Sequence, residues 1–477
     1  MSYIRPQKTI CFLAVLALAF GSFIINQSAF NTDDDYRSFD EVVYWQLGLG
    51  LKERPLKYNS HSAAELISLN SSIEKEKLPD YFTAPLFKHP PFFPFLTSLS
   101  MRLFGDDIQV ARYVSQLMGA LLILMTYLLA KDLFGYNVGV LSAAFVYLDP
   151  VINMCSQKIW MDTTLAFLTL LSLYLFVRAL KTENTWFFIS SGMVAGLALN
   201  TKYTGGLVLM TFVIYSFFWK RDLFANRYFI FSLFLPLIML FPWLCLNYRV
   251  YGFSSVTGHE ELQIFLKQIY PFMVSGIIGS ALICYVYLFL KRKKWFDNLK
   301  HVRKDLCSNQ TVQKIFKLCL GLSMLIVLKD YLMGSLDFFH QPKTSLVHSF
   351  IYEPPIFYFG RLLEYSFIFA FAYLALFSGF HKKNVYGVPL KITIALILLF
   401  FSAWGYFQCR YILAAVPLLI ILGVACWSHF LKDLHKVNSP IIAFSSRLML
   451  RLTLIYIILR AIFLNFNLTY SKSVCYF

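Results

Sequence analysis

The sequence predicts an all-α membrane protein that crosses the bilayer about thirteen times and carries one large polar loop on the outer face. Hydrophobic residues make up 58% of its 477 residues, aromatic residues 18% and charged residues only 14%, whereas soluble proteins carry about 25% charged residues. The apolar residues form long blocks that are almost free of charge. Because a helix satisfies its own backbone hydrogen bonds, such blocks are typical of transmembrane helices.

The blocks lack the polar stripe at helical spacing that a helix on a soluble core needs, which disfavours a soluble fold. We expect thirteen spans, of which the third is the shortest, at residues 9–27, 111–130, 137–150, 162–178, 186–200, 204–219, 228–247, 270–290, 315–333, 363–380, 390–407, 411–430 and 447–466. We divide the chain into a catalytic transmembrane module, residues 1–250, and C-terminal helices, residues 251–477, that complete a groove.

The distribution of Lys and Arg predicts that the N-terminus lies inside. With that orientation, the inner loops and flanks carry 22 basic residues and the outer ones carry 8. The largest inner cluster runs from Lys291 to Lys314, and we interpret it as a topology anchor near anionic lipid. The net charge of +17 therefore needs no nucleic-acid partner. A cleaved signal peptide is the alternative for the first span, but no small-x-small site follows Ile25, which favours an uncleaved anchor.

The nine cysteines are scattered, mostly within apolar blocks. They form no CxxC motif and no His/Cys pattern with the spacing of metal ligands, so the sequence predicts neither a disulfide framework nor a zinc site.

The first outer loop, residues 29–107, contains 12 of the 26 acidic residues. Its last part, PPFFPFLTSLSMRLFG, is typical of an amphipathic helix that lies along the membrane surface. We therefore expect short juxtamembrane helices in this loop. The chain has no convincing internal repeat, which disfavours the transporter folds that are built from two related halves.

Three carboxylates at the predicted outer membrane edge are candidate catalytic residues: Asp40 and Glu41 in SFDEVVYWQLG, and Asp162 in QKIWMDTTLAFL. A carboxylate that leads into an apolar helix is costly unless it is solvated, paired or near a helix N-terminus. Asp162 has the alternative interpretation of an N-cap at the membrane boundary. The run from Asp33 to Asp35 is more simply a solvated charge run.

Five side chains on the outer side complement these carboxylates, namely His89, Arg112, Lys202, Arg361 and Arg410. Each of them alone is explained by a snorkelling side chain. Together with a carboxylate base, they predict a site for an anionic leaving group. Phosphate is the obvious candidate, because Arg and Lys bind it well and keep their charge at neutral pH.

Several motifs, taken in order, resemble a known family. They are DEVVY at 40–44, HPPFFPFLTSLSMRLFGDDIQVARYVSQLMG at 89–119, LAKDLFG at 129–135, the loop from Pro150 to Asp162, GLALNTKYTG at 196–205 and RYILAAVPLL at 410–419. On these motifs the chain resembles the membrane glycosyltransferases of the GT-C superfamily. The branch is the one with the protein O-mannosyltransferases and the lipid A aminoarabinose transferase (families 39 and 83). Between residues 250 and 400 no motif contributes, and the resemblance there rests on hydropathy alone.

The resemblance implies a GT-C fold and inverting transfer of a sugar from a polyprenyl- or dolichyl-phosphate donor. The acceptor would be a hydroxyl or phosphate of a protein, lipid or glycan on the outer or lumenal face. It implies no nucleotide and no obligatory cofactor or metal. The alternatives are a transporter or flippase of a lipid-linked intermediate, and a catalytically silent scaffold. We expect a bacterial inner membrane with a periplasmic site; the endoplasmic reticulum is the alternative.

Carried over to single residues, the resemblance implies that Asp40 is the base or acceptor-positioning group, with Glu41 as its partner in the motif. Asp162 corresponds to the second acid of the site. His89 stands where the aminoarabinose transferase has a lysine, and a neutral histidine there would offer the donor phosphate a hydrogen bond but less charge. Arg112 and Lys202 correspond to structural or phosphate-binding positions. The polar stretch 59–80 departs from the family and suggests an acceptor-specific insertion.

Overall fold

The computed structural model describes residues 4–28, 39–53, 90–251, 328–339, 357–377, 384–402, 408–434 and 440–470, and every regular element in these ranges is a helix. The first half contains α1 (Ile4–Ser28), α2 (Phe39–Glu53), α4 (Phe92–Phe104), α5 (Ile108–Phe134), α6 (Tyr136–Tyr147), α7 (Pro150–Gln157), α8 (Met161–Thr182), α9 (Thr185–Leu199), η4 (Tyr203–Gly206), α10 (Leu207–Trp219), η5 (Arg221–Ala225) and α11 (Arg227–Tyr251). The second half contains α16 (Lys329–Leu336), α17 (Phe357–Tyr365), α18 (Ile368–Phe377), η6 (Val385–Gly387), α19 (Val388–Ser402), η7 (Cys409–Ile412), α20 (Val416–Leu434) and α21 (Pro440–Tyr470).

The boundaries between the early helices follow from local sequence. Gly105 and Gly135 separate α4 from α5 and α5 from α6, and their φ angles of 105° and 99° are accessible mainly to glycine. Asp107 caps α5, since its carboxylate accepts a hydrogen bond from the Gln109 amide at 2.7 Å. Asp149 caps α7 in the same way, and Pro150 occupies the first helical position.

Seven helices in the described part of the chain are long and apolar enough to span a membrane: α1, α5, α8, α11, α19 with η6, α20 and α21. An eighth span is formed if α6 and α7, which are bent by 57° at their junction, count as one. Shorter apolar helices coincide with the predicted spans at 186–200, 204–219 and 363–380. The all-helical membrane fold is confirmed. The number thirteen stays a prediction, because the span at 270–290 and most of 315–333 lie outside the described residues.

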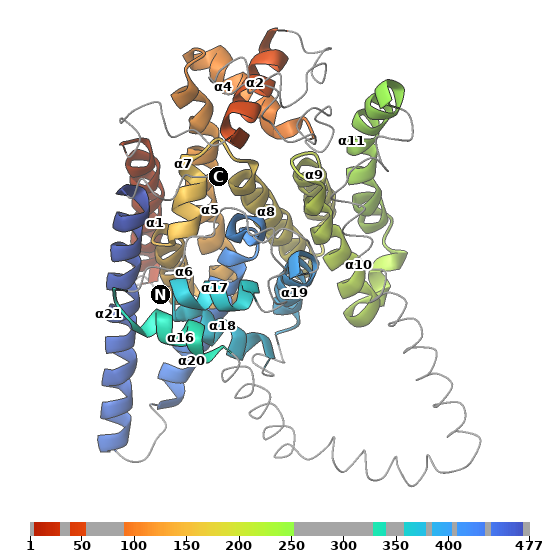
Figure 1. The fold of residues 1–477 in the computed structure, drawn as a ribbon. Helices are drawn as coiled ribbons and strands as arrows, with labels where there is room; N and C mark the ends of the chain where they lie inside the picture. Colours follow the sequence, from red (N-terminus) through yellow and green to blue (C-terminus); the bar gives the residue numbers. More distant parts are fainter. Residues whose placement is uncertain are drawn as a thin grey trace, which may run out of the picture.

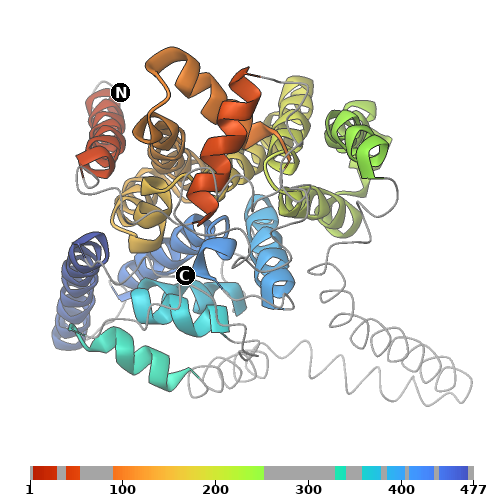
Figure 2. The same ribbon diagram turned by 45° about the horizontal axis from the view of Figure 1, so that its top comes forward.

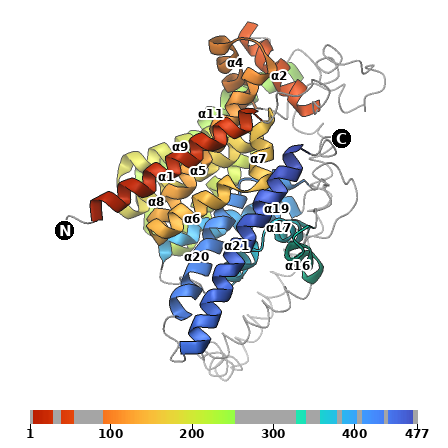
Figure 3. The ribbon, with the colours of Figure 1, turned by 90° about the vertical axis from the view of Figure 1, so that its left-hand side faces the viewer.

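The long helices form a bundle, and α2 and α4 lie together at one end of it (Figures 1 and 3). Viewed towards that end, α2 lies across the ends of the central helices, while α1 and α21 lie at the edge (Figure 2). The predicted helix in the first outer loop is thus present as α4. Since α1 leads from the opposite end of the bundle towards α2, the end that carries α2 and α4 is the one predicted to face outward.

Two hydrophobic cores hold this arrangement together. The main core contains residues from both halves of the chain, for example Ala120 and Leu170 beside Phe369 and Leu418. A second core attaches α2 and α4 to the ends of the spans, with Tyr44, Leu47, Phe93 and Met101 packed near Met161 and Trp243. Burial of these side chains positions α2, and with it Asp40 and Glu41, against the bundle.

Candidate active site

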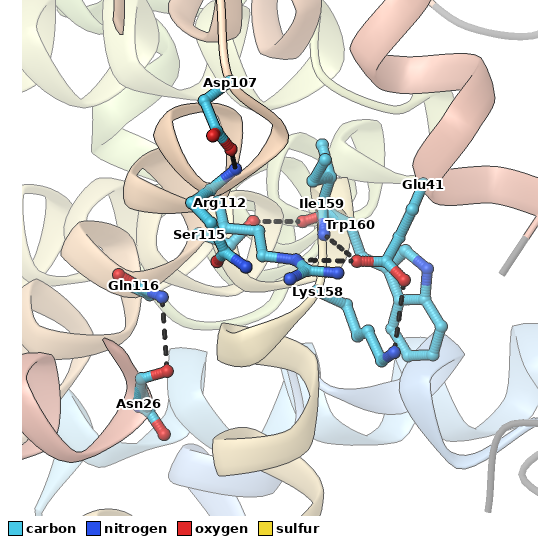
Figure 4. A network of polar contacts seen from close by, with 10 residues as sticks. Asn26, Glu41, Asp107, Arg112, Ser115, Gln116, Lys158, Ile159 and Trp160 are labelled. Carbon is cyan, nitrogen blue, oxygen red and sulfur yellow. Dashed lines mark hydrogen bonds and ion pairs between the residues drawn. The ribbon is translucent and has the colours of Figure 1, made fainter. Parts of the chain in front are cut away.

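Glu41 lies in the first turn of α2 and is fully buried among positive charges. Its carboxylate is 3.2 Å from Nε of Arg112 and 3.2 Å from Nζ of Lys158, and it accepts a hydrogen bond from the Ile159 amide at 3.2 Å (Figure 4). Arg112 belongs to α5, and Lys158 and Ile159 belong to the link between α7 and α8. One carboxylate therefore joins the start of α2 to two other parts of the bundle.

The link between α7 and α8 is extended, with ψ near 155° at Lys158 and 136° at Trp160. It is attached to α5 as well, because the Ser115 hydroxyl donates a hydrogen bond to the Trp160 carbonyl at 3.1 Å (Figure 4). These contacts fix the backbone that carries the Trp160 side chain.

Asp40, the residue before Glu41, is paired with Arg410 from the other half of the chain. Nη2 of Arg410 lies 2.6 Å from Oδ2 of Asp40. The guanidinium is held from several sides, since its Nε donates to Oε1 of Gln408 at 2.5 Å. Its Cζ also lies 4.5 Å from the ring centroid of Trp160 and 5.5 Å from that of Tyr411. Arg410 is therefore fixed by cation–π contacts and a hydrogen bond in addition to the ion pair.

Asp162 forms a second ion pair next to the first. It lies in the first turn of α8, two residues after the N-cap Trp160, and it accepts from Nζ of Lys202 at 3.0 Å. Asp162 is thus not the N-cap, although a carboxylate in the first turn still interacts favourably with the helix dipole. Nζ of Lys202 lies 4.6 Å from the centroid of the same Tyr411 ring that Arg410 contacts. The cations of the two ion pairs, Lys202 and Arg410, therefore contact the same aromatic ring, that of Tyr411.

Tyr44 of α2 connects the two pairs electrostatically. Burial raises the pKa of its phenol well above the ordinary value, and the negative charges of Asp40 and Asp162 raise it further. The phenol consequently stays neutral and keeps its proton for donation.

A small, partly open crevice, with room for about one water molecule, lies beside Tyr411. Apolar side chains from α8, α10 and α19 line most of it, including Leu165, Val208, Ile397 and Phe401, and Thr204 contributes a hydroxyl. The charged cluster thus shares Tyr411 with a small, mostly apolar crevice.

The structure brings together four of the predicted site residues, Asp40, Asp162, Lys202 and Arg410. It places Glu41 and Arg112 behind them in a buried pair. Arg361 lies on α17, which packs against η7, and it pairs with Glu364 at 2.7 Å. His89 lies outside the described residues.

Sequence reasoning missed Lys158, Trp160, Tyr44 and Tyr411 as members of the site. A signal was present for each. Lys158 and Trp160 lie shortly before the motif acid Asp162, and Tyr44 and Tyr411 lie within the DEVVY and RYILAAVPLL motifs. No group of three or more potential metal ligands occurs within the residues that the structure describes.

Fold and site together define a polytopic membrane protein with carboxylate–cation pairs at the end of the bundle that carries α2 and α4. The family model described as dolichyl-phosphate-mannose-protein mannosyltransferase matches residues 88–246. An uncharacterized protein of Aquifex aeolicus (strain VF5) is 26% identical over 231 residues, which is 46% of this chain and 44% of the relative. The chain thus spans less than half the length of that relative.

Solved structures show the same fold. ArnT from Cupriavidus metallidurans bound to undecaprenyl phosphate matches with a TM-score of 0.53 and 15% identity, over 97% of this chain and 76% of that one. The archaeal oligosaccharyltransferase AglB from Archaeoglobus fulgidus, in complex with an inhibitory peptide and a dolichol-phosphate, matches with a TM-score of 0.54 and 16% identity, over 98% of this chain and 56% of that one. The GT-C fold is confirmed, and so is the resemblance to the GT-C membrane glycosyltransferases of the O-mannosyltransferase and ArnT-like branch.

Proposed function

We propose that the protein is a GT-C glycosyltransferase that moves a sugar from a polyprenyl- or dolichyl-phosphate donor to an acceptor at the outer membrane surface. The observation that carries this proposal is the pair of ion pairs, Asp40–Arg410 and Asp162–Lys202, around Tyr411. A base, two cations for an anionic leaving group and an adjoining apolar crevice are the parts that such a reaction needs.

In the proposed reaction, an acceptor oxygen attacks C1 of the sugar from the side opposite the lipid phosphate. The bond from C1 to the phosphate oxygen breaks, and its electron pair leaves with the lipid phosphate. Where the acceptor is a hydroxyl, its proton passes to the Asp40 carboxylate, which acts as general base. The attack inverts the configuration at C1.

Arg410 and Lys202 would stabilise the leaving group. The charge on the phosphate grows from one negative charge in the diester towards two in the departing monoester, and fixed cations offset that growth. Asp162 would position Lys202 for this task, while Glu41, enclosed by Arg112 and Lys158, would position the first turn of α2 rather than exchange protons with substrate.

The isoprenoid chain of the donor would lie along the crevice beside Tyr411, between the apolar side chains of α8, α10 and α19. The crevice is narrow, so the side chains that line it would have to move apart for the lipid. The aromatic rings of Trp160 and Tyr411 would face the donor at the membrane surface, where such amphipathic rings are favoured.

The charge distribution and the position of α2 and α4 support a site on the periplasmic face of a bacterial inner membrane, with the lumenal face of the endoplasmic reticulum as the alternative. The acceptor would approach from the side of the first outer loop, and the module of residues 1–250 would supply most of the catalytic groups. The sugar and the acceptor would be selected by the shape of the pocket around the two ion pairs.

The test is transfer by the purified protein in nanodiscs, supplied with polyprenyl-phosphate sugars and membrane acceptors. Asp40→Asn should lower the transfer rate by about 100-fold or more, the loss typical of a removed general base. Asp106→Asn is the matched control, because Asp106 is an exposed carboxylate on the same side that pairs with Lys52. Full transfer by the Asp40 variant would refute its role. Lipid translocation without any transferred sugar would favour the flippase alternative.

A further inference from the structure

We propose that the two carboxylates of the site mask its two cations until the donor arrives, and that the donor phosphate then takes their place. Binding of the donor would thereby release Asp40 to act as a base. This inference rests on the proposed function, because it assigns the displacing anion to the phosphate of the donor.

The first observation is that both cations of the site are already occupied by acids. Arg410 lies 2.6 Å from Asp40, and Lys202 lies 3.0 Å from Asp162. A phosphate that approaches these cations therefore meets two neutralised pairs rather than an open positive pocket. The full positive charge of either cation becomes available to the phosphate only when its pair opens.

The exposed fractions indicate which member of each pair moves. Side-chain exposure is 12% for Arg410 and 39% for Asp40. Arg410 is also held by Gln408, Trp160 and Tyr411, so it stays while Asp40 leaves.

The second pair has the opposite asymmetry. Lys202 is 23% exposed and Asp162 only 5%. The lysine has a flexible stem and extends over the Tyr411 ring, so it is the member that turns towards the phosphate. Asp162 stays in the first turn of α8.

The exchange couples the base to the donor. A carboxylate that accepts hydrogen bonds from a guanidinium holds a proton less readily than one that is released. When phosphate takes over Arg410, Asp40 becomes the stronger base at the moment when its substrate is in place. As the bond to the sugar breaks, the growing charge on the phosphate strengthens its hold on Arg410 and completes the release of Asp40.

Such coupling is reciprocal, so weakening the masking pair must strengthen phosphate binding. The gain should depend on Arg410, whereas the removal of a base that does not pair with this cation would change phosphate affinity only through its charge, with or without Arg410. Asp40→Asn should bind undecaprenyl phosphate about 5- to 10-fold more tightly than the wild type, within the usual range of coupling between sites. Asp162→Asn should shift the affinity in the same direction.

The experiment measures the Kd of undecaprenyl phosphate, without sugar, for the full chain in nanodiscs. Asp106→Asn controls for the loss of one negative charge and should leave the Kd unchanged, because its partner Lys52 lies outside the site. In an Arg410→Met background the Asp40 substitution should lose its effect, since the cation that it unmasks is gone. Thermal unfolding of each variant verifies that it is folded.

Equal or weaker binding by Asp40→Asn would overturn the exchange, and so would a gain that survives in the Arg410→Met background. If the wild type and the folded variants all fail to bind undecaprenyl phosphate beyond what undecaprenol binds, the proposed function itself fails, and the inference falls with it. Tighter binding by Asp40→Asn that depends on Arg410 supports both the exchange and the proposed function.

Discussion

Substitution of Glu41 by glutamine tests whether the buried carboxylate anchors α2. The change keeps the size of the side chain and removes one negative charge between Arg112 and Lys158, each 3.2 Å away. Both cations are almost fully buried, so they would be left without compensation in a region of low dielectric constant. Breaking a buried ion pair from one side costs about 3–5 kcal/mol.

That cost translates into a measurable shift in thermal stability. The entropy of unfolding is about 2.1 cal/mol/K per residue, or about 1 kcal/mol/K for a chain of this length. The apparent Tm should therefore fall by about 3–5 °C. Transfer activity should fall as well, because Asp40 is the neighbouring residue on the released turn of α2.

The assay is the apparent Tm in detergent at one fixed scan rate, since large membrane proteins commonly unfold irreversibly. Asp106→Asn is the control and should change stability by less than about 1 kcal/mol, as is usual for exposed pairs. Arg112→Met combined with Glu41→Gln should cost less than the sum of the two single changes. A Tm within 1 °C of the wild type, or strictly additive effects, would refute the anchoring role.

Three further predictions concern other parts of the molecule. Gly192→Ala should destabilise the contact between α9 and α11 by about 1–3 kcal/mol, because the new methyl group would lie 2.2 Å from a backbone oxygen. Gly50→Ala should instead stabilise its helix by up to about 1 kcal/mol, because no atom lies within 4 Å of the new methyl group. The apparent Tm should therefore fall for Gly192→Ala and rise for Gly50→Ala. Val208→Trp should raise KM for long-chain donors but not for short-chain analogues; an equal rise for both would argue against lipid in the crevice. Arg361→Gln should lower Tm, because it weakens the pair with Glu364, and should leave the Kd of undecaprenyl phosphate unchanged; weakened binding would show that Arg361 also contacts the donor.

Hydropathy predicts the described spans well, because lipid excludes any backbone that is not hydrogen-bonded internally. It misses the bend between α6 and α7, although Asp149 and Pro150 are a local signal for a new helix start. The short helices of 10–17 residues are also ambiguous by length alone, since a buried helix and a short span have the same composition.

The candidate carboxylates could be predicted because a charge at the edge of an apolar block has few explanations. Their partners could not, because the choice among five outer cations depends on contacts between distant segments. Arg410 reaches Asp40 across most of the chain, whereas Arg361 pairs with a glutamate three residues away. The i,i+3 spacing of Arg361 and Glu364 could have predicted this local pair.

The pairing of Asp40 with Arg410 has a consequence for the biogenesis of the protein. The two residues are about 370 positions apart, and ribosomes add about 5–20 residues per second. Asp40 therefore enters the membrane about 20–75 s before its partner is synthesised. During that interval the nascent chain holds its base without Arg410, so a truncated or stalled product would lack a complete site. The proposed site is therefore complete only after η7, which carries Arg410, has joined the bundle.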